Sequence, residues 1–127
     1  MKKIGFITTN KVLAQSLAAA IKNYPDLGFE PCLLINPDQV LLDAEIQNIE
    51  IAVVDMTWSA QEKSHSVFSL CKGLHKVVPC GKIFLLVPQR DPLAKDIAMR
   101  AIKCNLADDY VFFDVSLDYL LTKLLAL

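Results

Sequence analysis

The sequence has few glycines, no paired cysteines and no long apolar run. Only four of its 127 residues are glycine, and none belongs to a P-loop or a GxGxxG motif, so a loop that cradles nucleotide phosphates is excluded. No GxSxG nucleophile elbow is present either. We therefore find no catalytic residue in the sequence and do not expect an enzyme.

The four cysteines form no CxxC pair and no cluster with His65 or His75, so neither a zinc site nor a redox motif is indicated. We expect reduced cysteines that act as small core hydrophobes. No apolar run approaches the roughly 18 residues of a membrane span, and no signal peptide opens the chain. The expected location is the cytoplasm, without membrane association.

Charge and hydropathy narrow the class of partner. Thirteen basic and fourteen acidic residues give a net charge of -1, with no basic stripe that would neutralise many phosphates. Nucleic-acid binding by this domain is not expected. The apolar fraction of 54% leaves apolar surface available for a protein partner. The length suits one domain, residues 1–127.

Strand-like and helix-like patterns alternate five times along the chain. Five such units predict an α/β fold with a parallel sheet covered on both faces and with right-handed crossovers. The first helix follows Asn10, a suitable N-cap, and carries Leu13, Leu17, Ala20 and Tyr24 on its expected apolar face. The expected strands are 3–8, 29–35, 49–55, 83–87 and 109–113; the expected helices are 10–24, 36–47, 60–77, 92–104 and 117–125.

The third strand is the most informative segment. It is a nearly continuous apolar run that ends on one carboxylate, Asp55. A strand buried on both faces has this pattern, so Asp55 is expected at the carboxyl edge of a parallel sheet. Open α/β sheets place their binding sites at that edge.

Together, the strand ending at Asp55, the segment Ala107-Asp108-Asp109-Tyr110 and the five βα units resemble the receiver domain of bacterial two-component response regulators. The resemblance covers essentially the whole chain. It implies a flavodoxin-like (CheY-like) (βα)5 three-layer sandwich with a parallel five-stranded sheet in the order 2-1-3-4-5.

The resemblance also assigns roles to positions. Asp55 stands at the phosphoacceptor position, and Tyr110 stands where relatives carry an aromatic switch residue. The acidic pair that holds Mg²⁺ in relatives is replaced by Thr8 and Thr9. Val87 takes the position of the usual hydroxyl residue and Phe113 that of the usual lysine. The site is therefore expected to be degenerate, with no cofactor and with Mg²⁺ bound weakly if at all.

Several positions have ordinary structural interpretations as well. Asp55 either accepts a phosphoryl group or is an inherited carboxylate held by Thr8, Thr9 or backbone N–H groups. Tyr110 either switches or is simply packed. Trp58 either covers the site, offers a docking anchor or packs. Asp108 and Asp109 are expected in a turn at the opposite edge, and His65 and His75 are expected in solvent.

Three functions remain open. The first is a pseudo-receiver that binds a histidine kinase, an output domain or another signalling protein, or forms a homodimer. Its contact face would comprise the 92–104 helix, the 109–113 strand and the 117–125 helix, with Leu93, Lys95, Lys103 and Tyr110. The second is a receiver phosphorylated on Asp55. The third is a flavodoxin-like module that binds a small ligand in a pocket lined by Thr8, Thr9, Asp55, Trp58 and Val87.

Overall fold

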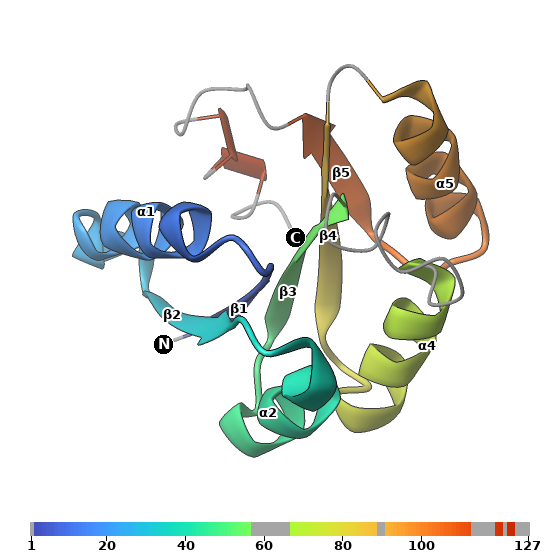
Figure 1. The fold of residues 1–127 in the computed structure, drawn as a ribbon. Helices are drawn as coiled ribbons and strands as arrows, with labels where there is room; N and C mark the ends of the chain where they lie inside the picture. The colour runs from blue at the N-terminus through green and yellow to red at the C-terminus, as the bar shows by residue number, and fades with distance from the viewer. Residues whose placement is uncertain (1, 57–66, 89–90, 113–118, 121, 124–127) are drawn as a thin grey trace.

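The computed structural model describes residues 2–56, 67–88, 91–112, 119–120 and 122–123. Its five strands form one parallel sheet in the order β2-β1-β3-β4-β5 (Figure 1). This is the sheet order expected from the sequence. The strands are β1 (Lys2–Ile7), β2 (Phe29–Leu34), β3 (Ile51–Asp55), β4 (Lys82–Val87) and β5 (Asp109–Phe112).

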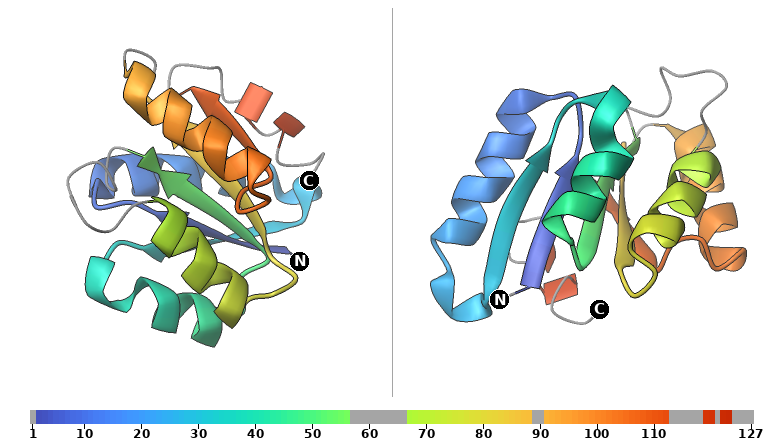
Figure 2. Two further views of the ribbon diagram at one scale, coloured as in Figure 1. Left: turned by 90° about the vertical axis from the view of Figure 1, so that its right-hand side faces the viewer. Right: turned by 90° about the horizontal axis from the view of Figure 1, so that it is seen from below.

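Helices cover both faces of the sheet and make it the middle layer of three. The α-helices are α1 (Lys11–Lys22), α2 (Val40–Gln47), α4 (Val67–Val77) and α5 (Pro92–Lys103), and short 3-10 turns occupy Pro25–Leu27 and Pro37–Gln39. Figures 1 and 2 show α2, α4 and α5 on one face and α1 on the other. The helical residues 119, 120, 122 and 123 lie on the α1 side.

Alternation along the strands separates two cores. Val54 and Leu85 face α2, α4 and α5, whereas Val53 and Phe84 belong to the cluster that includes Ile21 of α1. All five residues of β3 are buried. The unbroken apolar run that precedes Asp55 is thus explained by a central strand with a core on each side.

Helix α1 begins where the sequence predicts, because the side chain of Asn10 accepts a hydrogen bond from the Leu13 N–H at 3.0 Å. Its buried face was predicted incorrectly. Ala14, Ala18 and Ile21 are the buried residues, and Tyr24 lies beyond the end of the helix and is exposed. Small alanines let the helix approach the sheet closely, so the buried stripe follows size as well as hydropathy.

The strand at Asp55 begins two residues later than the apolar run suggested. Asn48 ends α2 in the left-handed conformation, with φ of 53°, and the Ile49 N–H donates to the carbonyl of Ala44. Ile49 is therefore buried as part of the helix end and not as part of the ladder.

Some predicted features lie outside the described residues. These are Trp58, His65, Phe113, the first turns of the 60–77 helix and most of the 117–125 helix. Among the helices that the structure does describe, none has the length and apolar character that crossing a membrane requires.

Candidate functional site

The carboxyl edge of the sheet brings together three residues singled out in the sequence. Thr8 directly follows β1, Asp55 ends β3 and Val87 ends β4. These strands are adjacent, since β3 pairs with β1 on one side and with β4 on the other. The site positions on the first, third and fourth strands therefore lie side by side, as the fold class predicts.

Asp55 is a buried carboxylate held by a hydroxyl. Asp55 is 2% exposed and Thr8 is 3% exposed. The Thr8 hydroxyl donates a hydrogen bond to Oδ2 of Asp55 at 2.5 Å. A hydrogen bond to an ionised acceptor is short and roughly twice as strong as a neutral one. This contact is one of those weighed for Asp55 from the sequence, and it occupies one of the carboxylate oxygens.

The Thr8 hydroxyl is itself fixed from the other side. The backbone N–H of Asn10 donates to Thr8 Oγ1 at 3.0 Å. The hydroxyl thus accepts one hydrogen bond and donates another, which defines its orientation. From the sequence we identified Asn10 only as a helix cap and missed its second contact, a local turn in which the Thr8 hydroxyl accepts the N–H two residues further on.

The remaining positions of the site differ in environment. Val87 is fully buried and apolar, so it offers no hydrogen bond to a group at Asp55. Thr9 is exposed, and the threonine that binds Asp55 is Thr8. Phe113 and Trp58 lie outside the described residues. Of the pocket proposed for a small ligand, the structure therefore describes every residue except Trp58.

The two residues that follow β1 are hydroxyl residues, whereas Mg²⁺ usually takes carboxylates. This ion prefers six oxygen ligands and is normally held by one or two carboxylates. Thr8 and Thr9 provide neutral hydroxyls where relatives provide an acidic pair, and the Thr8 proton already points at Asp55. Within the described ranges, no three His, Cys, Asp or Glu side chains gather as a metal site.

Tyr110 is half-buried and packed. Its ring meets that of Phe112 edge to face with centroids 5.7 Å apart, and Lys95 Nζ lies 6.0 Å from the centroid of Phe112. Both rings pack against the core on the α5 side of the sheet. Leu93 of α5 is 69% exposed, so it is more accessible to a partner than the half-buried rings of Tyr110 and Phe112.

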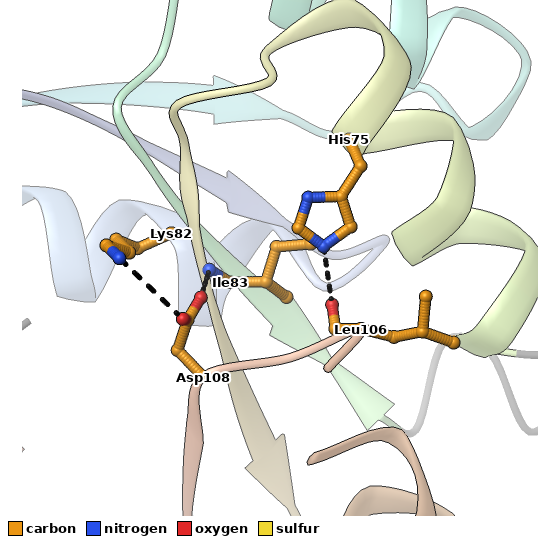
Figure 3. A network of polar contacts seen from close by, with 5 residues as sticks. All are labelled: His75, Lys82, Ile83, Leu106 and Asp108. Atoms are coloured by element: carbon orange, nitrogen blue, oxygen red, sulfur yellow. Dashed lines mark hydrogen bonds and ion pairs between the residues drawn. The ribbon is translucent and has the colours of Figure 1, made fainter. Parts of the chain in front are cut away.

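The opposite edge of the sheet carries a polar network that the sequence only partly indicated. Asp108 Oδ2 accepts the Ile83 N–H at 2.8 Å, and Oδ1 lies 4.0 Å from Lys82 Nζ (Figure 3). Asp108 and Asp109 lie at the start of β5, as expected, but Asp108 joins this turn to β4. Asp109 pairs with Lys123 at 3.0 Å.

His75 was predicted to be solvated, and this is wrong. It is half-buried on α4, and its Nε2 lies 3.0 Å from the carbonyl oxygen of Leu106 (Figure 3). The two residues are 31 positions apart, so the contact depends on the packing of the loop before β5 against α4. No local pattern reveals it.

The cysteines are free, but they are not all core residues. Cys71 is buried and Cys32 is half-buried, whereas Cys80 and Cys104 are exposed. Burial, with a smaller contribution from the charge of Asp108, raises the pKa of Cys71 to about 12. Such a thiol is unreactive at neutral pH. The expectation of core packing therefore holds for Cys71 and is wrong for Cys80 and Cys104.

A shallow hollow also lies at this opposite edge. It is lined by residues at the starts of β3 and β4 and at the end of α4, among them Ile49, Leu74, Val78 and Lys82. It is too shallow to enclose a water molecule. We assign it no binding role.

Comparison with known proteins yields matches in structure only. No family model and no curated protein matches the sequence. A response regulator from Burkholderia pseudomallei, solved with a phosphorylated aspartic acid, a calcium ion and citrate, matches with a TM-score of 0.75 at 24% identity. The match covers 96% of this chain and 65% of the other, so this chain spans slightly less than two thirds of that protein.

Two further structures match over almost the whole chain. A two-component response regulator from Clostridium difficile has a TM-score of 0.77 at 19% identity, covering 99% of this chain and 94% of the other. An adenylate cyclase from Rhodopirellula baltica has a TM-score of 0.79 at 13% identity, covering 98% and 85%.

The sheet order and these matches define the class of fold. The chain has the flavodoxin-like α/β fold of response regulator receiver domains, the CheY-like fold, as the sequence predicted. At these identities the likeness concerns the fold, and the chemistry at Asp55 has to be argued from this chain's own residues.

Proposed function

We propose that this chain is a receiver-like signalling domain that has lost phosphotransfer chemistry and acts by binding a protein partner. One observation carries the proposal: Asp55 stands at the phosphoacceptor position with an oxygen bound by Thr8, beside the apolar Val87. Each change at the site removes charge or hydrogen bonding that a phosphoryl group would need. We propose no enzymatic activity, no cofactor and no functional Mg²⁺ site.

The burial of Asp55 makes the loss of charged and hydrogen-bonding groups around it more costly for phosphorylation. A phosphoryl group on Asp55 would bring close to two negative charges to a residue that is 2% exposed. Thr8 offers a single hydroxyl hydrogen there, and Val87 offers none. An uncompensated charge at such a site is unfavourable, so both formation and retention of the adduct are expected to fail.

The partner face that we propose consists of α5 and β5, together with the 117–125 segment that the sequence predicts as a helix. On α5, Leu93 and Met99 are exposed apolar residues, 69% and 43% accessible. Exposed Lys95, Arg100 and Lys103 form a basic rim on the same helix, interrupted by one exposed acidic residue, Asp96. The excess of positive charge favours an acidic protein surface over a second copy of the same helix, because two copies would bring more like than opposite charges together. A histidine kinase, an output domain or another signalling protein fits this description; a homodimer is the alternative.

The phosphoryl test is direct. Incubation with acetyl phosphate, or with a beryllofluoride mimic, should leave the intact mass and the amide NMR spectrum unchanged. An Asp55→Asn variant is the matched control, since it cannot form an acyl phosphate. A stoichiometric adduct that appears on the wild type and not on this variant would refute the proposal.

Such an adduct would instead support a phosphorylatable receiver. The observation in favour of that alternative is the likeness to the Burkholderia pseudomallei protein, whose structure contains a phosphorylated aspartic acid. In that case Thr8 would have to leave Asp55, and the amide shifts of Thr8 and Asn10 should change together with the mass.

A further inference from the structure

Three hydrogen bonds in series connect Asp55 to the first turn of α1. The Thr8 hydroxyl donates to Asp55 Oδ2 at 2.5 Å. The Asn10 N–H donates to Thr8 Oγ1 at 3.0 Å. The Asn10 side chain in turn accepts from the Leu13 N–H at 3.0 Å and caps the helix. The series therefore runs from a buried carboxylate on the third strand to the exposed start of a helix.

The middle of this series has little freedom. The Thr8 hydroxyl has one hydrogen, which is directed at Asp55, and its lone pair faces Asn10. Thr8 and Asp55 are almost completely buried, so water does not readily replace the hydrogen bond between them, and adjoining hydrogen bonds polarise each other there. A weaker bond to Asp55 would loosen the hydroxyl and, with it, the acceptor of the Asn10 N–H.

Toward β4, the described residues at the end of the strand, Leu86 and Val87, are buried and apolar. Val87, at the end of β4, has an apolar side chain and cannot accept or donate a hydrogen bond. Tyr110 and Phe112 on β5 are held by packing and by their edge-to-face contact. A change in charge at Asp55 therefore has a polar route to α1 and no comparable side-chain route through Val87.

We propose that Thr8 is a positioning residue that ties the charge of Asp55 to the N-terminus of α1, so that a change at Asp55 affects the start of α1 more than it affects β5. The surface affected includes Lys11 and Val12, and Val12 is 73% exposed. The inference deepens the proposed function and rests on it, because it takes unmodified Asp55 as the resident state of the site.

Amide hydrogen exchange followed by NMR tests this relay. Asp55→Asn keeps the shape of the side chain but removes its charge, and it should speed exchange at the Asn10 amide about three- to tenfold, the scale of one weakened hydrogen bond. Leu13 should respond in the same direction, whereas amides of β4 and β5 should change less. In a Thr8→Val background, Asn10 should exchange fast already, and adding Asp55→Asn should have no further effect there.

The conservative variant separates a relay from general destabilisation. Thr8→Ser retains the hydroxyl and should preserve the response of Asn10 to Asp55→Asn. Thr8→Cys, of similar size but with a weak donor, should lose that response and serves if the valine variant fails to fold. The relay is refuted if Asp55→Asn leaves Asn10 unchanged, if its effect is the same with valine or cysteine at position 8, or if the amides of β5 change more than that of Asn10.

These outcomes are distinguishable from failure of the proposed function. The exchange experiment uses protein that has never met a phosphodonor. A phosphoryl adduct on Asp55 would refute the loss of phosphotransfer while leaving the exchange data intact. An intact mass that shows no adduct, together with an unresponsive Asn10, would refute the relay alone.

Discussion

Asp108 and Ile83 exchange two hydrogen bonds. The backbone N–H of Asp108 donates to the carbonyl of Ile83 at 2.8 Å, and the Ile83 N–H donates to Oδ2 of Asp108 at 2.8 Å. The Asp108 side chain thus extends the pairing of β4 with β5 by one residue, toward the start of β4. Because Asp108 belongs to the turn before β5, this exchange fixes where the edge strand docks on the sheet.

Replacing Asp108 should destabilise the fold by weakening the attachment of β5 to β4. Asp108→Ala leaves the Ile83 N–H without its acceptor and should lower the free energy of unfolding by about 1–3 kcal/mol. Asp108→Asn keeps one oxygen and should lower it less. Urea unfolding followed by circular dichroism measures both.

Lys82→Ala provides the control for charge. Lys82 lies 4.0 Å from Asp108, and its side chain is half-exposed, so its removal should change stability by no more than about 1 kcal/mol. An equal loss in the lysine and aspartate variants would contradict the role that we assign to the Ile83 N–H.

The thiols should differ in reactivity. Cys80 and Cys104 are exposed and should be alkylated by iodoacetamide in the native protein at pH 8. Cys71 should not, because its pKa of about 12 leaves roughly one molecule in ten thousand as thiolate at that pH. Peptide mass spectrometry after a timed quench distinguishes the sites, and unfolded protein, in which all four cysteines should react, is the control. Early labelling of Cys71 would show that its burial is transient.

The same pKa predicts a dependence of stability on pH. The Cys71 thiol ionises near its ordinary value of 9.0 in the unfolded chain and near 12 in the folded one. Between these values the folded state holds the extra proton, so stability should fall as the pH rises above 9, by at most about 1.4 kcal/mol per pH unit. Cys71→Ala should remove this contribution. If the free energy of unfolding depends on pH in the same way in the wild type and in Cys71→Ala, the contribution that we assign to Cys71 is contradicted.

Magnesium should not saturate the site. With Thr8 and Thr9 in place of acidic residues, amide shifts around Asp55 should change linearly with low millimolar Mg²⁺ and show no plateau. The double variant Thr8→Asp/Thr9→Asp should gain saturable binding, because neighbouring carboxylates attract the ion to relieve their repulsion. Saturation of the wild type below one millimolar would overturn our assignment of the site, whatever the variant does.

The partner surface can be tested with a matched pair of charges. Leu93→Asp places a charge at the most exposed apolar residue of the face proposed on α5, and Ile46→Asp places one at a similarly exposed position on α2, outside that face. Only the first should weaken binding to a purified, identified partner, by about tenfold or more for a central apolar contact. Circular dichroism should report an intact fold in both.

Salt dependence gives a second reading of the same contact. If the basic rim formed by Lys95, Arg100 and Lys103 meets an acidic surface, association should weaken as ionic strength rises. Sedimentation velocity on the protein alone measures self-association. A dimer that Leu93→Asp dissociates would favour the second copy as the occupant; binding unaffected by Leu93→Asp would place the contact elsewhere.

Local sequence signals determined most of the fold. Apolar runs located the five strands because a central parallel strand must be apolar on both faces. Asn10 marked the start of α1 because its side chain can accept a backbone N–H only three residues away. The run that ends at Asp55 placed this carboxylate at the correct edge of the sheet, since parallel strands end together.

Contacts between distant segments were decided by the tertiary structure. The contact between Thr8 and Asp55 depended on the register of β1 against β3, which brings together two residues 47 positions apart. His75 and Leu106 meet only because α4 packs beside the loop before β5. The buried stripe of α1 and the burial of Cys71 likewise depended on how closely each helix approaches the sheet. Hydropathy and spacing record the preference of a residue for burial, but its neighbours are chosen by packing across the whole domain.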